Sequence, residues 1–447
     1  MDTGSTAWIL ASTAAVLLMV PGLALFYGGM VGARGVLNMI MMTCASFALV
    51  GVLWVFFGYS AAFGNSYGGH GLLGNVTEYL GLGQLLAEDP KATIPPALFA
   101  AFQLLFAAIT VALIAGAVSD RLKFASWMTF AGVWAVLVYF PVAHWVFAFD
   151  SADGAVKGGW IANQLKAIDF AGGTAVHINA GAAALALALV TGRRKAFPGK
   201  LARPHNLPFT VLGAGILWFG WLGFNGGSAL AAGNAASVVV LNTTVAGCAG
   251  LLAWIVVEKL RDGHATTLGA ASGLIAALVA ITPACGAVSP LGAIAIGAAA
   301  GVVCPYAIPL KYRFGYDDSL DVVGVHLAGG ILGTLLIGLL ATADAPNATD
   351  GLFYGGGFAA LGRQAVAAGA VAAYSFVVSI LIALAVKATI GLRVDEETEH
   401  AGLDLALHAE SAYDLAPLPA VRHPDPPAPS ASRSSDDAEL QPELVEG

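Results

Sequence analysis

The chain has 447 residues, of which 58% are apolar and only 11% are charged, whereas an average soluble domain carries about 25% charged residues. So few charges cannot cover the surface of a water-soluble globule, which argues against soluble enzymes and nucleic-acid-binding proteins. The net charge of −8 is unevenly placed, because 13 of the 28 Asp and Glu residues lie at or after Asp395. The composition therefore predicts an apolar membrane body followed by an acidic tail.

Long apolar segments recur along the chain, and a bilayer core about 30 Å thick needs about 20 such residues per helix. Eleven segments qualify, near residues 6–29, 38–62, 97–118, 125–147, 170–190, 208–230, 235–257, 266–282, 288–310, 322–341 and 364–386. The first segment has no basic residue before it and no convincing cleavage site, so we interpret it as a membrane span and not as a signal peptide. The sequence predicts an all-α polytopic protein of the cell (plasma) membrane with eleven transmembrane helices.

The basic residues predict the orientation of these helices, since the loops on the inner side of a membrane carry the excess of Lys and Arg. With the N-terminus outside, the inner side receives fourteen: Arg34, Arg121, Lys123, Arg193, Arg194, Lys195, Lys200, Arg203, Lys259, Arg261, Lys311, Arg313, Lys387 and Arg393. The outer side receives four: Lys91, Lys157, Lys166 and Arg363. We therefore expect the N-terminus outside and the C-terminus inside.

Eleven spans divide as five, five and one, and a second copy of five spans must be inverted across the membrane. Inverted repeats that share a site near the midplane are common in transporters. A short sequence similarity favours this division. Span five contains AGGTAVH, ending at His177, and span ten contains GVHLAGG, with His326. We expect an inverted repeat of five spans plus one further span.

Ionisable residues inside membrane spans are costly and are candidates for function. His177 and His326 are two of them, and they lie in corresponding spans of the expected repeat. Paired imidazoles can share a proton and line a pore, although a lone histidine can also be a packing residue. Asp169 lies eight residues before His177, about 12 Å along a helix. It is placed either to cap the helix or to orient carbonyl groups toward a cation.

Aromatic residues gather on three other spans. Phe102 and Phe106 are spaced by four residues, Trp221 and Phe224 lie on span six, and Phe147 ends span four. Packing or an interfacial belt explains such residues taken singly. Together they favour a cation–π vestibule above a hydrophobic constriction. The hydroxyl of Ser228, one turn past Phe224, is placed to accept a hydrogen bond from an N–H donor.

Six sequence motifs carry a family resemblance. They are GLALFYGGMV (22–31), FQLLFAAITVALIAGA (102–117), DFAGGTAVHINA (169–180), GWLGFNGGSAL (220–230), DDSLDVVGVHLAGG (317–330) and GLRVDEETEHAGLD (391–404). With these motifs the chain resembles the ammonium transporter family, which includes the Amt, Mep and Rhesus proteins. The resemblance implies eleven spans, an outside N-terminus and a homotrimer with one pore per subunit.

The resemblance also implies roles for individual residues. Phe106, Phe147 and Ser228 match the outer ammonium site, and Phe106 and Phe224 match the stacked phenyl gate. The remaining matches are the pore-lining residues His177, His326, Trp221 and Phe102 and the essential acid Asp169. One position departs from the family, which usually has Trp where this chain has Phe147. Phenylalanine is a weaker cation–π partner than tryptophan, which puts the affinity of the outer site in question.

The expected function is transmembrane transport of ammonium or ammonia, with no cofactor and no metal. The cysteines Cys44, Cys248, Cys285 and Cys304 have neither metal-binding nor redox spacing. The alternatives are an ammonium sensor and, less favoured, a Rhesus-type neutral-gas channel. An aquaporin-like channel lacks its Asn-Pro dipeptides, and a metal hydrolase would need ligands within about 2–2.5 Å of one ion.

The chain divides into three expected parts. Residues 1–390 form the transport domain, 391–415 a cytoplasmic regulatory segment, and 416–447 an acidic, Pro- and Ser-rich tail expected to be disordered. In the family, the segment that matches 391–415 packs beneath neighbouring subunits, and trimeric PII-type signal proteins block the inner pore mouth. The resemblance therefore implies a PII-type partner, in addition to the substrate and the lipid bilayer.

Overall fold

A computed structural model describes residues 1–89, 92–199, 203–347 and 349–413. Its secondary structure within these ranges is helical, with only three isolated β-bridges. Residues Met1–Ala412 form one compact unit. Lys91, Lys200 and the expected tail 416–447 lie outside the described residues.

The helices follow one another along the chain in two halves. The first half contains α1 (Thr3–Leu17), α2 (Met19–Met30), α3 (Val36–Leu53), η1 (Trp54–Gly58), α4 (Tyr59–Phe63), η2 (Tyr67–Gly69), η3 (Leu80–Leu86), α5 (Pro96–Ile114), η4 (Ala115–Ala117), α6 (Phe124–Trp134), η5 (Ala135–Tyr139), α7 (Phe140–Phe147), η6 (Ile161–Leu165), η7 (Gly173–Ile178) and α8 (Asn179–Thr191). The second half contains α9 (Leu207–Gly227), α10 (Asn234–Asp262), α11 (Thr267–Ile281), α12 (Pro290–Ala307), α13 (Leu310–Phe314), η8 (Val323–Leu327), α14 (Ala328–Leu340), η9 (Leu352–Tyr354), α15 (Ala359–Thr389), α16 (Glu396–Ala401) and α17 (Leu403–His408).

All eleven expected spans coincide with apolar helical stretches. Within the described ranges, ten stretches are long and apolar enough to cross a membrane, which confirms a multi-pass membrane protein. The stretch at the eighth expected span is α11, an apolar helix of only 15 residues. At about 1.5 Å per residue it is shorter than a bilayer core. The count of eleven crossings and the orientation of the chain therefore stay predictions.

Two of the spans begin with a single π-helical turn, a rare element that is frequent at functional sites. The turn η7 contains His177 and continues into α8, and the turn η8 contains His326 and continues into α14. The two histidines thus occupy the same kind of element in corresponding spans. This likeness supports the expected inverted repeat.

Small residues allow the helices to approach closely, as is common in membrane proteins. A Cβ atom at Gly213 of α9 would collide with the backbone of Phe26 on α2, and one at Gly297 of α12 would collide with the backbone of Ala246 on α10. Any larger side chain at these two positions would push the helices apart. The high glycine content, 56 residues, therefore serves helix packing at such crossings.

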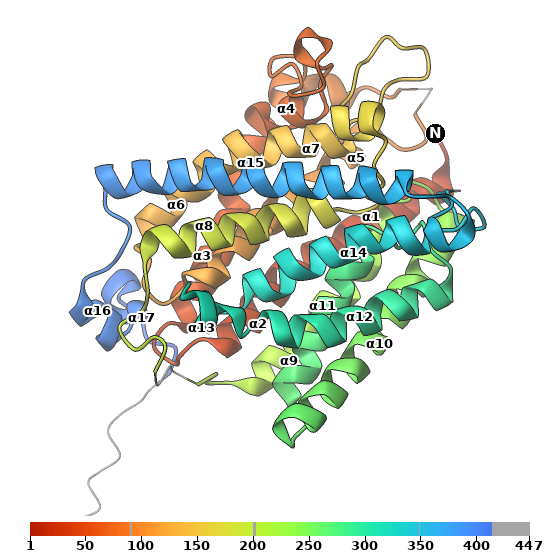
Figure 1. The fold of residues 1–447 in the computed structure, drawn as a ribbon. Helices are drawn as coiled ribbons and strands as arrows, with labels where there is room; N and C mark the ends of the chain where they lie inside the picture. The colour runs from red at the N-terminus through yellow and green to blue at the C-terminus, as the bar shows by residue number, and fades with distance from the viewer. Residues whose placement is uncertain (90–91, 200–202, 348, 414–447) are drawn as a thin grey trace, which may run out of the picture. The chain divides into compact units, whose positions relative to one another are not determined.

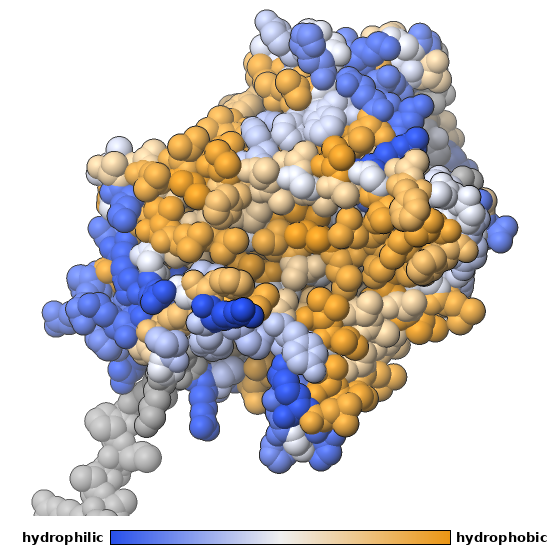
Figure 2. Space-filling model, in the orientation of Figure 1, coloured by the Kyte–Doolittle hydropathy of each residue, from blue (hydrophilic) through white to orange (hydrophobic). Residues whose placement is uncertain are grey.

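The surface of the bundle is divided by polarity. On the face shown in Figure 2, hydrophobic side chains form a broad band between two hydrophilic regions. The short helices α16 and α17 lie at one end of the bundle in Figure 1, and the start of α1 lies toward the opposite end. The band is the surface that we expect lipid or neighbouring subunits to cover.

Candidate functional site

The residues expected at the outer site meet in a cavity of about 710 Å³. We call this cavity the outer vestibule, because the predicted orientation places it on the outer side. Its lining includes Phe106, Phe147, Ser228 and Asp169. The structure therefore brings all three members of the expected outer site, together with the expected essential acid, into one hollow.

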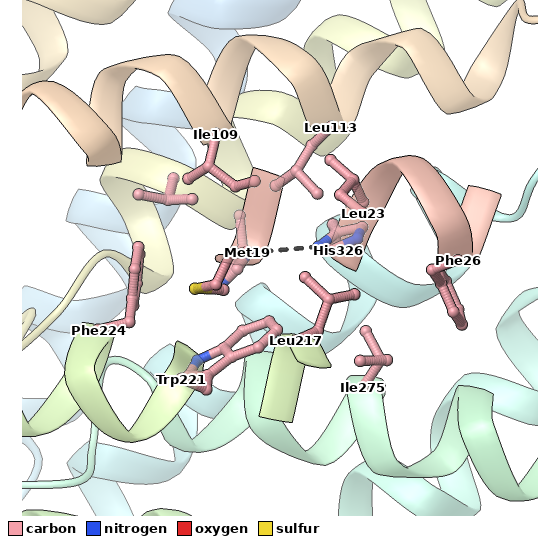
Figure 3. A pocket seen from close by; sticks show the side chains of 12 residues that line it. Met19, Leu23, Phe26, Ile109, Leu113, Leu217, Trp221, Phe224, Ile275 and His326 are labelled. Atoms are coloured by element: carbon pink, nitrogen blue, oxygen red, sulfur yellow. Dashed lines mark hydrogen bonds between the residues drawn. The ribbon is translucent and has the colours of Figure 1, made fainter. Parts of the chain in front are cut away.

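A second, narrow cavity lies deeper in the bundle, and we call it the lumen (Figure 3). Its lining is almost wholly apolar and consists of Met19, Leu23, Phe26, Ile109, Leu113, Val176, His177, Leu217, Trp221, Phe224, Ile275 and His326. The space open to the centre of a water-sized molecule is about 20 Å³. One water needs roughly 10–15 Å³ by this measure, so the lumen has room for about one molecule of that size.

Two phenyl rings separate the cavities. Phe106 of α5 lines the outer vestibule, whereas Phe224 of α9 lines the lumen. Their rings are stacked with centroids 3.9 Å apart and planes 15° apart. Phe102 is fully buried and contacts Phe106 at a centroid distance of 4.9 Å, but it lines neither cavity. Phe102 therefore lies beside the stacked pair, and its expected pore-lining role stays a prediction.

The two histidines face each other within the lumen. Their Nδ1 atoms are 3.2 Å apart, and the ring planes differ by 26°. A hydrogen bond between two such atoms needs a proton on one ring and a free lone pair on the other. The Nε2 atom of His177 has no protein partner among the described residues. The pair is therefore built to share a proton, which can reside on either ring.

Trp221 is held against this pair by a hydrogen bond that the sequence did not reveal. Its indole stacks on His177 with a centroid distance of 5.5 Å. The indole N–H donates to the Thr282 hydroxyl at 2.8 Å, and that hydroxyl donates to the Leu278 carbonyl at 2.7 Å. Thr282 lies 61 positions away in the sequence, so no local motif could have pointed to it.

The carboxylate of Asp169 caps the start of η7. It accepts hydrogen bonds from the backbone N–H groups of Gly172, Gly173 and Thr174, each at 2.7 Å, and one from the Thr174 hydroxyl. Burial raises the pKa of Asp169 above its ordinary value, although these hydrogen bonds oppose the rise. The sequence left two roles open for Asp169, capping the helix or orienting carbonyl groups toward a cation. The observed hydrogen bonds are those of a helix cap.

A second aspartate repeats this arrangement in the other half of the chain. Asp318 lies eight residues before His326, as Asp169 lies eight residues before His177. Its carboxylate accepts a hydrogen bond from the backbone N–H of Val323, the first residue of η8. Asp318 was not among the predicted site residues, yet the shared spacing of Asp and His was visible in the sequence.

The unusual position Phe147 has no tryptophan substitute nearby. Its ring meets Phe106 edge-on, with centroids 6.3 Å apart. Trp145 instead donates its indole N–H to the Leu72 carbonyl at 2.7 Å and packs against Trp160; it is not part of the vestibule lining. The hydroxyl of Ser228 donates to the Phe224 carbonyl at 2.8 Å, which leaves its oxygen available as an acceptor.

Charged residues at the predicted inner side form a compact cluster. Arg194 bridges Asp120 and Asp317, and the fully buried Arg121 donates to the Asp317 carbonyl and to the Ser319 hydroxyl. Burial alone would raise the pKa of Asp317, but the hydrogen bonds and charges of Arg194 and Arg121 outweigh burial and lower it. The cluster ties the ends of several helices together.

The segment after α15 docks on this side of the bundle. The carboxylate of Asp404 accepts hydrogen bonds from the backbone N–H groups of Leu37 and Asn38, at the start of α3. Helix α3 has no side-chain cap within its own segment, so the docked segment supplies one. Glu396 also forms an ion pair with Lys195 at 2.9 Å. The acidic segment and a basic inner loop therefore do pair within one chain.

A bundle of apolar helices that encloses a narrow lumen defines a membrane transport protein. A model of the Ammonium Transporter Family matches residues 7–413. The chain belongs to this family. An ammonium transporter of Mycobacterium tuberculosis (strain ATCC 25618 / H37Rv) is 57% identical over 437 residues, covering 93% of this chain and 91% of that protein.

Solved structures agree with this assignment. The crystal structure of Saccharomyces cerevisiae Mep2 has a TM-score of 0.80 and 33% identity, covering 89% of this chain and 88% of that one. A sensor Amt protein has a TM-score of 0.82 and 27% identity, covering 90% of this chain and 98% of that one. The family consists of transporters and not of enzymes, which confirms the class and the membrane location expected from the sequence.

Proposed function

We propose that this chain moves ammonium across the membrane by recruiting the cation and conducting ammonia. The cation is recruited in the outer vestibule by the rings of Phe106 and Phe147 and by the Ser228 hydroxyl. It gives its proton to water in the vestibule, and ammonia passes the stacked rings of Phe106 and Phe224 into the lumen. Trp221 and the two histidines then guide it inward.

Energetics favour the neutral molecule inside the lumen. Placing a bare ammonium-sized ion in a low-dielectric space costs several kcal/mol even after relaxation. Removing a proton from an amine with a pKa of about 10 costs roughly 4 kcal/mol at pH 7. The apolar lining and the small volume of the lumen support the neutral route. Potassium has no proton to lose and no N–H donor, so it is rejected.

The histidine pair provides a route for the released proton. The 3.2 Å contact between the Nδ1 atoms of His177 and His326 allows a proton to change rings without a large movement. We propose that the pair carries the proton inward alongside ammonia. Asp169 acts by fixing the turn η7, which holds His177 in place.

The position of the phenyl pair is the observation that most strongly supports the proposed function. Phe106 lines the outer vestibule, Phe224 lines the lumen, and the two rings are stacked on each other. A solute that moves from one cavity to the other must displace this pair. Such a swinging hydrophobic barrier suits a small neutral molecule and disfavours a hydrated ion.

A plugging experiment tests the pathway. Leu217 and Phe219 both lie on α9, but Leu217 lines the lumen and is buried, whereas Phe219 is 57% exposed on the outside of the bundle. We expect Leu217→Trp to abolish methylammonium uptake by cells that lack their own ammonium transporters, because the lumen has room for about one water-sized molecule. Phe219→Trp is the matched control and is expected to transport normally. Full uptake by a correctly folded Leu217→Trp protein would refute this pathway.

The proposed assembly is a homotrimer with a pore in each subunit. Both cavities and the phenyl pair are built by residues of a single chain, which supports one pathway per subunit. We also propose a trimeric PII-type signal protein as the cytoplasmic partner. The docked acidic segment beside the basic inner loops supports regulation at that side.

A second candidate function is ammonium sensing. One structural neighbour is a sensor Amt protein that shares the fold over 90% of this chain. Binding at the outer vestibule alone would suffice for a sensor. Sensing and transport are separated by the uptake measurement, since a pure sensor binds ammonium without moving it.

A further inference from the structure

One lysine lines the cavity in which the cation is recruited. Lys166 belongs to the outer vestibule together with Phe106, Phe147 and Ser228. Its side chain is exposed, and its ammonium group forms no hydrogen bond or ion pair with the residues that the structure describes. A second vestibule lysine, Lys157, differs in this respect, because its ammonium group lies 3.9 Å from the carboxylate of Asp150.

The backbone at Lys166 is also unusual. It follows the π-turn η6 with φ 57° and ψ 39°, in the left-handed region. Glycine adopts this conformation freely and asparagine adopts it more readily than most residues, whereas lysine is disfavoured there. Backbone outliers of this kind cluster at functional sites. The fold thus holds an unpaired ammonium group at the vestibule on a backbone that would suit an uncharged residue better.

We propose that Lys166 sets the ammonium affinity of the outer vestibule by electrostatic repulsion. The charged groups in the vestibule lining are Lys157, Lys166 and Asp169. Asp169 is engaged by the helix that it caps, and Lys157 is paired, so the unpaired positive charge of Lys166 opposes the arriving cation. The inference rests on the proposed function, and it adds a residue that tunes affinity to those that bind and conduct.

Coulomb's law gives the size of the effect. If the lysine and the cation are taken to be about 10 Å apart, two unit charges repel by an amount that roughly halves occupancy in bulk water, and apolar walls strengthen the repulsion. The repulsion reaches about 30 Å at 0.01 M salt but only about 10 Å at 0.1 M. Removing the charge is therefore expected to raise affinity about two- to fivefold at low salt and by less at high salt.

The test uses three variants at this position. Lys166→Gly and Lys166→Asn remove the charge and suit the left-handed backbone, whereas Lys166→Arg keeps the charge. The half-saturation concentration for methylammonium uptake is measured in cells at about 0.01 M and 0.15 M external salt. We expect both neutral variants to have a half-saturation about two- to fivefold below that of the wild type at low salt, with a smaller difference at high salt. Lys166→Arg is expected to match the wild type.

Arg363→Gln provides the control for charge outside the vestibule. Arg363 is exposed, belongs to the outer side by the predicted orientation, and is not part of the vestibule lining. The potential of the lipid surface is the same for every variant. The ratio of each variant's half-saturation concentration to that of the wild type therefore isolates the effect of the charge at Lys166. An unchanged or raised half-saturation in both neutral variants, or the same decrease in Arg363→Gln, overturns the inference while leaving transport established. A complete lack of uptake by the wild type would instead overturn the proposed function.

Discussion

His177 and His326 lie 149 positions apart in the sequence, yet their Nδ1 atoms are separated by 3.2 Å in the lumen. Each follows an aspartate by eight residues, and each lies on a π-helical turn whose backbone N–H group donates to that aspartate. The contact therefore joins two copies of one local arrangement. It also makes the proton state of one ring depend on that of the other.

The first prediction concerns this pair. Replacing either His177 or His326 with Asp places a carboxylate in the lumen, where an anionic group attracts and stabilises cations. We expect either variant to admit potassium, measured as potassium-driven current in reconstituted membranes. The neutral variants His177→Asn and His326→Asn are the controls and are expected to exclude potassium. If both Asp variants exclude potassium and keep their ammonium-driven currents, the histidine pair has only a structural role.

The second prediction concerns Phe147, whose ring meets Phe106 edge-on in the outer vestibule. Phe147→Trp supplies a stronger cation–π partner and is expected to strengthen cation binding by roughly 0.5–1 kcal/mol. This corresponds to about a two- to fivefold lower half-saturation for ammonium or methylammonium. Phe219→Trp, on the exposed side of α9, controls for the added indole. An unchanged half-saturation would show that this ring does not limit affinity.

The third prediction concerns the docked segment after α15. Truncation before Gly391 removes Asp404 and with it the cap of α3, so we expect reduced methylammonium uptake or loss of its dependence on nitrogen status. Truncation that removes only 416–447 is expected to leave both unchanged, because the docking residues Glu396 and Asp404 precede that segment. Normally regulated uptake after the longer truncation would argue against a regulatory role.

The fourth prediction is a pH dependence at Asp318. Burial raises its pKa to about 6, an effect that the nearby Lys311 partly opposes. Between the ordinary value of 3.8 and about 6 the folded protein holds this proton and the unfolded chain does not. Stability therefore falls as pH rises through this window, and the penalty is complete above it.

Asp318→Asn removes this penalty, because the amide is neutral and its oxygen can still accept from the Val323 N–H. At pH 7.5 we expect a gain on the order of 1–3 kcal/mol, seen as a higher thermal midpoint in detergent. The gain is expected to vanish near pH 4. The exposed Asp344 provides the control variant Asp344→Asn. The difference in thermal midpoint between Asp318→Asn and the wild type should depend on pH. A difference that stays the same at all pH values would show that the buried charge of Asp318 is not its cause.

Much of the fold could be predicted because apolar length alone identifies a membrane helix. Each expected span, from 6–29 to 364–386, coincides with an apolar helical stretch. The roles of Phe106 and Phe224 came from the family resemblance, since aromatic spacing by itself also fits packing. Hydropathy could not show that α11 is only 15 residues long or that two spans begin with π-turns, because these features depend on local hydrogen bonding.

The missed residues share one physical reason. Thr282 holds Trp221 and Asp404 caps α3 through contacts between positions that are distant in the sequence. A polar residue in an apolar segment or in a charged tail gives no sign of its partner. The pore-lining role of Phe102 came from the family resemblance; its ring contacts Phe106 from the same face of α5, but it lines neither of the two cavities.

The most direct test of the transport pathway is uptake of labelled methylammonium by the purified protein in sealed liposomes. We predict saturable uptake when methylammonium is added outside, no inhibition by an equal concentration of potassium, and no uptake by Leu217→Trp, whose bulk fills the lumen. Folded wild-type protein that binds ammonium but shows no uptake above that of empty liposomes would contradict the transport pathway and favour the sensor.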